Sequence, residues 1–270
     1  MKKFFAVLVS AGSFILCAEN LVVNGDASKG MENWSENQVL LIDEEGNSFF
    51  QSVAPGVLCS QIIEVDPAAH YNMSARFKAV DKNKGAQVLF AIRPLDADKK
   101  SIPAVCVTFL PDSNMILAAE CKASDTVIKV KDASAVKLDK AHIAYVGFDA
   151  KADLSDLPNR NLSKGQISKI ARNGDLWEIT LKKPCGMNYP AGTAVRIHRE
   201  SAAYMYPVKK IILKDDAWHR VQGRTYGKAK NGGASSVYFW NGTKYIQLVI
   251  VPGRNGMVYF DDVVFEKIVK

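Results

Sequence analysis

The chain has 270 residues, of which 48% are hydrophobic and 23% charged, and its formal net charge is +7. This length and composition exclude a disordered protein and suit one large domain or two small ones. The charges are scattered, with no Lys/Arg block longer than a pair, which argues against nucleic acid as a partner. No stretch after residue 18 is long and apolar enough to span a bilayer.

The first eighteen residues have the pattern of a secretory signal. A Lys2-Lys3 pair precedes an apolar stretch over residues 4–16, and Ala18 offers a small residue for signal peptidase. Removal of this segment lowers the formal charge to +5, from 33 basic and 28 acidic residues. We therefore expect a secreted, periplasmic or cell-surface protein. A lipoprotein signal with Cys17 as the lipidated residue is the alternative, which the bulky residue before it disfavours.

Four cysteines follow the signal segment, and none has a CxxC or Cys/His spacing that would indicate a metal site. They are Cys59, Cys106, Cys121 and Cys185. An exported chain permits disulfides, and four cysteines allow three connectivities, while buried free thiols are the alternative. If any pair forms, we expect Cys121 with Cys185, because both lie near the edges of the middle part of the chain.

Strand signals dominate both ends of the chain. Apolar and polar residues alternate over residues 71–77 and continue in 88–92 after a Lys-Gly turn. Two more strands are predicted over 236–240 and 245–250, joined by Asn-Gly, a strong hairpin signal. No amphipathic helical run of three turns occurs. Short strands with turn signals between them predict an all-β fold, either a sandwich or a barrel.

The middle of the chain, from about Leu117 to Arg199, is a compact series of short predicted strands. The clearest cover residues 126–130, 143–146, 165–170 and 176–181. Residues 149–163 form a long polar segment with almost no pattern. A loop of that length usually has a function or packs on a neighbour.

The two ends of the chain carry family motifs in a characteristic order. The mature N-terminus reads Glu19-Asn-Leu-Val-Val-Asn-Gly-Asp26, and the C-terminal part reads Gly256-Met-Val-Tyr-Phe-Asp-Asp-Val263. This series resembles the carbohydrate-binding modules of families four and nine. The resemblance implies a jelly-roll β-sandwich formed by residues 19–103 and 208–270, with a polysaccharide or glycan as its partner. Residues 104–207 interrupt it and are interpreted as an inserted small β-barrel-like module.

Many members of these families hold a structural calcium ion near the first strand and the closing aspartate. Asp26 and Asp262 remain as candidate ligands, because calcium favours carboxylates and backbone carbonyls. The acid that the family has two residues after Asp26 is replaced by Ser28, which removes one ligand. The alternative is a simple turn at Asp26 and the end of a strand at Asp262. No other cofactor is required.

Sugar recognition needs aromatic rings for C–H faces and planar polar groups for hydroxyls. Strand alternation predicts that both kinds of side chain gather on one concave face of the sandwich. The predicted carbohydrate-binding residues are Trp240, Tyr238, Tyr245, Gln247, Arg76, Gln87 and Arg93. The alternative is structural, because Tyr and Trp favour strands in any case and the inserted module can pack on them.

No catalytic residue is predicted. The adjacent pairs Asp215-Asp216 and Asp261-Asp262 would face opposite ways in a strand, and no HExxH, GxSxG or phosphate-loop motif occurs. We therefore expect a binding protein rather than an enzyme. Two alternatives stay open: a structural or adhesive cell-surface protein that uses the sandwich for protein contacts, and a small polysaccharide-degrading enzyme, either a glycoside hydrolase or a lyase.

Overall fold

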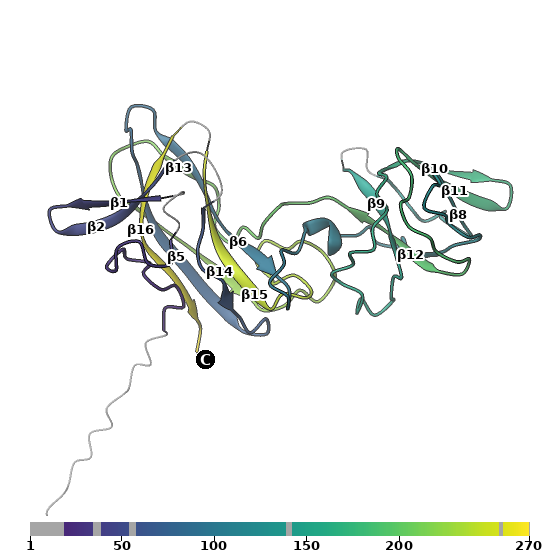
Figure 1. Cartoon of the computed structure of the whole chain (residues 1–270), viewed down its shortest axis with the longest axis horizontal. Helices are drawn as coiled ribbons and strands as arrows, with labels where there is room; N and C mark the ends of the chain where they lie inside the picture. The colour runs from purple at the N-terminus through teal and green to yellow at the C-terminus, as the bar shows by residue number, and fades with distance from the viewer. Residues whose placement is uncertain (1–18, 35–38, 54–57, 139–141, 254–255, 270) are drawn as a thin grey trace, which may run out of the picture.

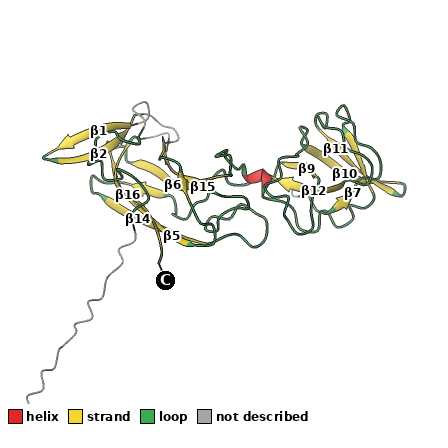
Figure 2. Ribbon diagram, turned by 60° about the horizontal axis from the view of Figure 1, so that its bottom comes forward, coloured by secondary structure: helices red, strands yellow, loops and turns green. Residues whose placement is uncertain are grey.

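The computed structural model describes residues 19–34, 39–53, 58–138, 142–253 and 256–269, and the predicted signal segment lies outside these ranges. The described part is all-β, which confirms the predicted fold class, with one short 3-10 turn, η1 (Ala104–Cys106). The molecule is elongated, with one body of strands at each end (Figure 1). The η1 turn lies between the two bodies (Figure 2). No helix in the described residues is long and apolar enough to cross a membrane.

The first body consists of two antiparallel sheets and is called the sandwich here. Its first sheet has the order β1-β2-β16-β5-β14. These strands are β1 (Val39–Glu44), β2 (Asn47–Ser52), β16 (Val258–Lys267), β5 (His70–Ala79) and β14 (His219–Tyr226). Its second sheet has the order β13-β6-β15-β3, and β4 also pairs with β15. These strands are β13 (Ile211–Leu213), β6 (Ala86–Leu95), β15 (Tyr245–Pro252), β3 (Leu58–Cys59) and β4 (Ile63–Glu64).

The two sheets of the sandwich bury a common aromatic core. Phe77 of β5 meets Phe90 of β6, with 5.7 Å between the ring centroids. Trp34 packs on Phe50 and Phe260 at 5.1 and 5.2 Å. Alternate residues of each long strand point inward, so the predicted alternation over residues 71–77 does place its apolar side chains in this core. Both ends of the chain therefore contribute to one core.

The second body is called the insert and has a core of its own, drawn from residues 115–197. One of its sheets has the order β7-β12-β9 and the other β10-β11-β8. The strands are β7 (Met115–Ile116), β12 (Ala194–Arg199), β9 (Ala144–Phe148), β10 (Ile167–Asn173), β11 (Leu176–Leu181) and β8 (Val127–Val130). Three residues of the predicted insert, Ala104, Val107 and Met205, instead contribute to the sandwich core.

The predicted strand over residues 236–240 and its hairpin are wrong. This segment is a loop held by its own side chains: Ser235 Oγ accepts hydrogen bonds from the backbone N–H groups of Val237 and Tyr238, at 3.2 and 3.0 Å. Such local bonds compete with a strand ladder for the same donors. The turn at Gly242 does form, with a φ of 82°, but only β15 follows it.

Cys121 and Cys185 lie together in the insert core, and both are buried. Burial raises the pKa of Cys121 to about 12, and the neighbouring Cys185 adds to that rise because it disfavours a thiolate at Cys121. Cys106 is buried in η1, whereas Cys59 belongs to β3 of the sandwich. The thiols of Cys106, Cys121 and Cys185 are free. A Cys121–Cys185 disulfide therefore stays a prediction, for which the packing of the insert brings the two partners together.

Candidate functional site

Trp240, which was predicted to stack on a sugar ring, is fully enclosed in the sandwich core. Its Nε1 donates a hydrogen bond of 2.8 Å to the backbone oxygen of Ser235, so its one polar atom is also satisfied. The predicted exposure of this ring is wrong. The reason is the loop at 236–240: without a strand there, alternation does not decide which way the ring points, and its large apolar surface is buried instead.

Four of the other predicted residues lie on the outer face of the second sheet. Gln247 of β15 and Arg93 of β6 are direct neighbours in register, and Arg93 Nη1 donates to Gln247 Oε1 at 3.3 Å. Gln247 Nε2 also donates to the oxygen of Ser60 at 3.1 Å. Tyr245 is covered on one side by Lys99 Nζ, 5.4 Å from its ring centre. Gln87 is exposed on β6 but sits at the opposite end of that strand.

Arg76 belongs to β5 of the first sheet, and its guanidinium is already engaged. It forms ion pairs with Asp261 and Asp262, at 2.6 and 2.8 Å, and lies over the ring of Trp218. Burial raises the pKa of Asp261, and Arg76 opposes that rise. The outer faces of the two sheets of a sandwich point away from each other. Arg76 therefore does not share a surface with Gln247, and the predicted single concave face is wrong.

The two candidate calcium ligands are both occupied by protein groups. Asp26 Oδ1 accepts hydrogen bonds from the Ser28 hydroxyl and backbone N–H, at 2.8 and 3.2 Å, and the Ser28 hydroxyl bond is the main cause that lowers the pKa of Asp26. Asp262 is paired with Arg76. No group of three or more metal-ligating side chains occurs in the described part of the chain. The calcium site at Asp26 and Asp262 stays a prediction.

The insert is held against the sandwich by specific contacts from both sides. Arg160 of the long loop reaches across to the sandwich, where its Nη2 pairs with Asp96 at 2.6 Å and donates to the oxygen of Ser101 at 3.0 Å. The hydroxyl of Thr108 accepts a hydrogen bond of 3.0 Å from the backbone N–H of Ala234. The loop at residues 149–163 therefore packs on a neighbour, which is one of the two roles expected for it.

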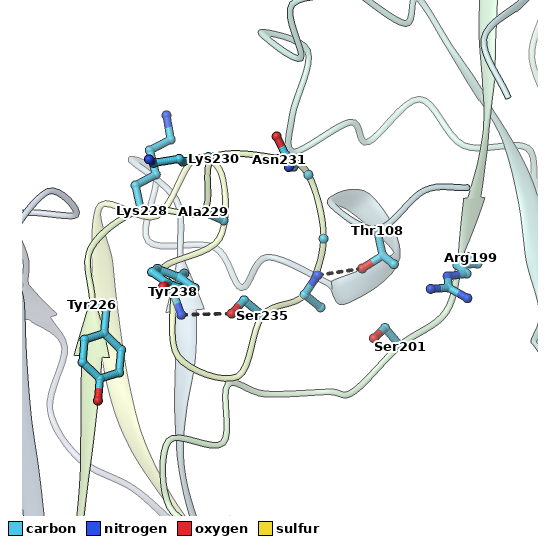
Figure 3. A pocket seen from close by; sticks show the side chains of 13 residues that line it. Thr108, Arg199, Ser201, Tyr226, Lys228, Ala229, Lys230, Asn231, Ser235 and Tyr238 are labelled. Atoms are coloured by element: carbon cyan, nitrogen blue, oxygen red, sulfur yellow. Dashed lines mark hydrogen bonds between the residues drawn. The ribbon is translucent and has the colours of Figure 1, made fainter. Parts of the chain in front are cut away.

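A cleft of about 650 Å³ opens where these two bodies meet. Three segments form it: the end of β12 with the residues that follow it, the segment around Thr108, and the loop that follows β14. Figure 3 shows the side chains that line it. The lining consists of Thr108, Arg199, Ser201, Tyr226, Lys228, Ala229, Lys230, Asn231, Gly232, Gly233, Ala234, Ser235 and Tyr238. The cleft is large enough for a small-molecule ligand or for two or three units of a polymer.

Two tyrosine rings stand side by side on the wall of the cleft. Tyr226 is the last residue of β14 and Tyr238 lies in the following loop; their centroids are 6.1 Å apart and the rings are tilted by 51°. Both rings are nearly half exposed, at 44% and 43%. The Ser235 hydroxyl holds the backbone of Tyr238, and Tyr226 N–H donates to the oxygen of Val237 at 2.9 Å. The two rings are therefore positioned by backbone contacts, and the His70 ring also packs on Tyr226, with 6.0 Å between the centroids.

The lining of the cleft is basic, with Arg199, Lys228 and Lys230 and no aspartate or glutamate. Figure 3 shows the two lysines on one side of the 231–235 loop and Arg199 on the other. Arg199 comes from the insert and the lysines from the sandwich side, so only the meeting of the two bodies brings the three charges together.

A second hollow of about 450 Å³ lies next to the cleft, because Tyr226 lines both. It runs over the outer face of β5 and β14, where Gln222 is opposite Ser74 and Arg224 is opposite Asn72. Arg224 Nε donates to Asn72 Oδ1 at 3.0 Å. Asn72 and Ser74 of β5 thus form a polar wall of this hollow, which also includes Tyr226.

No protein-family model matches the chain, and no curated protein sequence matches it. Among solved structures, a proposed sugar-binding protein from Bacteroides thetaiotaomicron aligns with 93% of this chain and 100% of its own, at 10% identity and a TM-score of 0.29. A fructosyltransferase from A. japonicus aligns with 94% of this chain and 34% of its own, at 7% identity and a TM-score of 0.20. Similarities this low carry no argument, so the site is judged from its own residues.

The loop at 149–163 contains a buried ion pair. Asp156 Oδ2 and Arg196 Nη2 of β12 are 2.6 Å apart, and both side chains are almost completely buried. Arg196 also lies over the ring of Phe109, at 4.3 Å. Burial lowers the pKa of Arg196, and Asp156 opposes that change. Asp156 is therefore a structural partner of Arg196, whereas Asp153 in the same loop is exposed.

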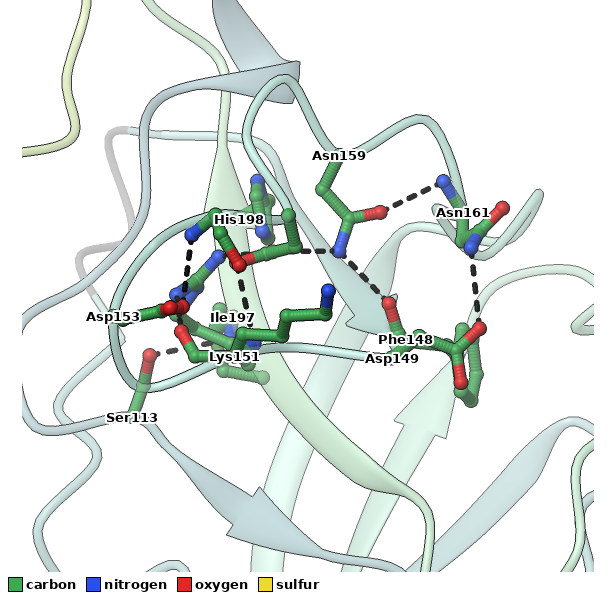
Figure 4. Close-up of polar contacts among 12 residues, drawn as sticks. Ser113, Phe148, Asp149, Lys151, Asp153, Asn159, Asn161, Ile197 and His198 are labelled. Carbon is green, nitrogen blue, oxygen red and sulfur yellow. Dashed lines mark hydrogen bonds and ion pairs between the residues drawn. The ribbon is translucent and has the colours of Figure 1, made fainter. Parts of the chain in front are cut away.

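His198 and Asn159 extend this buried network (Figure 4). A ring nitrogen of His198, Nδ1, lies 2.8 Å from the oxygen of Val105, and burial lowers the pKa of the ring to about 4. Asn159 donates to the oxygen of Phe148 at 2.8 Å and to Asp156 at 3.1 Å. These contacts fix the start of the insert and the long loop beside the cleft.

Most residues of the cleft were missed by the sequence analysis, which found only Tyr238. A usable signal does exist in residues 226–235, where an exposed tyrosine is followed by two lysines, a Gly-Gly pair and polar residues. Such a segment is typical of a loop that can approach a ligand closely. Arg199 has no comparable signal, because nothing near it in sequence indicates that it meets this loop.

Proposed function

We propose that this protein is an exported glycan-binding protein that holds a sugar chain in the cleft between the sandwich and the insert. One observation carries the proposal: the half-exposed rings of Tyr226 and Tyr238 stand on the wall of a hollow whose other lining groups are mostly polar or basic. Sugars present C–H faces that pack on aromatic rings and hydroxyls that need polar partners, and ligand sites combine the two.

The shape of the site favours a chain over a single sugar. The cleft and the polar hollow over β5 and β14 share Tyr226, so the two lie next to each other, and a chain bound in one can extend toward the other. The proposal keeps the jelly-roll interpretation of the sandwich and its resemblance to carbohydrate-binding modules. It moves the binding site from the predicted face around Trp240 to the junction with the insert.

The chemistry of the lining favours binding over hydrolysis. A glycosidase commonly needs two carboxyl groups on opposite sides of the scissile bond. The described lining of the cleft has none, and the polar hollow has only Glu266, which accepts a hydrogen bond from Asn72. The exported chain is therefore proposed to retain a polysaccharide without cleaving it.

The test is a glycan-array screen of the mature chain, followed by affinity measurements on Tyr238→Ala. Truncating a central aromatic at an interface commonly costs about 2 kcal/mol or more, which is roughly thirtyfold in affinity. Tyr238 is nearly half exposed, so its truncation should leave the unfolding midpoint almost unchanged. Product release over time is measured in the same samples, because soluble oligosaccharides would indicate an enzyme instead.

Tyr245→Ala is the matched control, since this partly exposed tyrosine belongs to the originally predicted face on β15. We expect it to keep the affinity of the unaltered chain. Loss of binding in Tyr245→Ala and not in Tyr238→Ala would return the site to that face. Binding to no glycan, combined with self-association or retention on cells, would support the adhesive alternative and refute the proposal.

A further inference from the structure

The three cations of the cleft have no partners among the residues that the structure describes. Within the described residues, the side chains of Arg199, Lys228 and Lys230 make no ion pair or hydrogen bond. The Nε atom of Arg199 is buried without any acceptor. By contrast, Arg160 of the insert forms an ion pair of 2.6 Å with Asp96 of the sandwich, so another cation at this junction does have an acidic partner.

An unsatisfied buried donor costs free energy, and like charges that gather without counter-charges repel each other. Both costs are removed when an anion binds, because each cation can then make a charge-assisted hydrogen bond. The neighbouring acid does not serve this purpose: Glu200 accepts a hydrogen bond from the Tyr145 hydroxyl at 3.1 Å and lies outside the cleft lining. The missing counter-charge is therefore expected from a ligand.

We infer that the cleft binds an acidic polysaccharide, whose carboxylate or sulfate groups contact Arg199, Lys228 and Lys230 while its sugar rings pack on Tyr226 and Tyr238. This inference rests on the proposed glycan-binding function and specifies its substrate class. The two lysines lie on one side of the 231–235 loop and Arg199 on the other (Figure 3). Repeated acidic groups along one chain match that arrangement.

The experiment compares acidic polysaccharides with their neutral counterparts by isothermal titration of the mature chain. Polygalacturonate is set against its fully methyl-esterified form, and dextran sulfate against dextran, so the two pairs separate carboxylate from sulfate. We expect at least one acidic form to bind about tenfold or more tightly than its neutral counterpart, because charge-assisted hydrogen bonds are roughly twice as strong as neutral ones. This affinity should fall as ionic strength rises.

The double variant Lys228→Gln/Lys230→Gln should lose about tenfold in affinity for that acidic form. Lys169→Gln is the matched control, because this exposed lysine of β10 makes no contact within the described residues and lies outside the cleft. It should bind as the unaltered chain does. Unfolding midpoints of all variants establish that the losses do not come from instability.

The two levels of the proposal fail in different ways. The acidic preference is overturned if polygalacturonate binds no more tightly than its ester and dextran sulfate no more tightly than dextran. If Tyr238→Ala still abolishes that binding, glycan binding in the cleft remains supported. Binding to none of the four polysaccharides would overturn the acidic preference. If the array screen also finds no ligand, glycan binding falls with it. Equally tight binding of single-stranded DNA, unaffected by Tyr238→Ala, would show only unspecific attraction of polyanions and would also refute the inference.

Discussion

The sandwich and the insert are stabilised by different kinds of core. The sandwich buries many aromatic rings, among them Trp240 and the stacked pair of Tyr71 and Phe265, whose centroids are 4.8 Å apart. The insert has a smaller, mostly aliphatic core and places charged and titratable groups beside it, including Arg196 and His198. Apolar packing adds up with buried area, whereas a buried charge is stable only while its partner is in place.

This difference indicates how each body responds to change. The sandwich should be sensitive to loss of volume, because most of its core consists of apolar side chains. The insert should be sensitive to pH and to redox conditions, because a histidine and two thiols are enclosed in it. Residues of both bodies line the cleft. Unfolding of either the sandwich or the insert should therefore abolish binding in the cleft.

The largest effect is expected for Trp240→Ala in the sandwich. Truncation of a fully buried aromatic residue commonly costs about 3–5 kcal/mol of the free energy of unfolding. Denaturant unfolding followed by circular dichroism measures it. Trp177→Ala is the matched control in the insert, where the ring is only partly buried, and it should cost less. A loss below about 1 kcal/mol for Trp240→Ala, the average of all point mutations, would contradict the assignment of this ring to the core.

A second prediction concerns the thiol pair of the insert. After oxidative export, we expect a Cys121–Cys185 disulfide formed by exchange with a disulfide oxidant, and peptide mapping by mass spectrometry without reduction detects it. Closing a loop of this length is expected to add about 4 kcal/mol to the free energy of unfolding, which reduction should remove. The double variant Cys121→Ser/Cys185→Ser should not respond to reductant. A Cys59–Cys121 link would refute the pairing.

The smallest effect is expected from the protonation of His198. Its folded pKa of about 4 lies below the unfolded value of 6.5, so the unfolded chain binds the proton more readily between these values. The free energy of unfolding should therefore fall as the pH drops below 6.5, by about 2 kcal/mol between pH 7 and pH 5. His198→Gln should abolish this part of the pH dependence, and unfolding curves at several pH values compare the two. If the free energy of unfolding falls with pH equally in the unaltered chain and in His198→Gln, the prediction is wrong.

The sequence by itself determined the fold class and, for much of the strand structure, which side chains point into the core and which point outward. Alternation over residues 71–77 placed Phe77 in the core, and it placed Arg76 outside, as the structure has it. Strand period and turn residues are local properties, so they can be read without knowing which strands are neighbours. The jelly-roll topology and a discontinuous domain of residues 19–103 and 208–270 stay predictions that follow from the resemblance.

Only the tertiary structure decided which outward side chains share a surface. Alternation separates the two faces of one strand, but it does not say that Arg76 will meet Asp261 and Asp262 or that Trp240 will turn inward from a loop. The cleft depends even more on distant contacts, since Arg199 lines the same cleft as Lys228 only because the insert docks on the sandwich through Arg160 and Thr108. The reason is physical: such meetings are set by the packing of whole bodies, and no local period in the sequence encodes them.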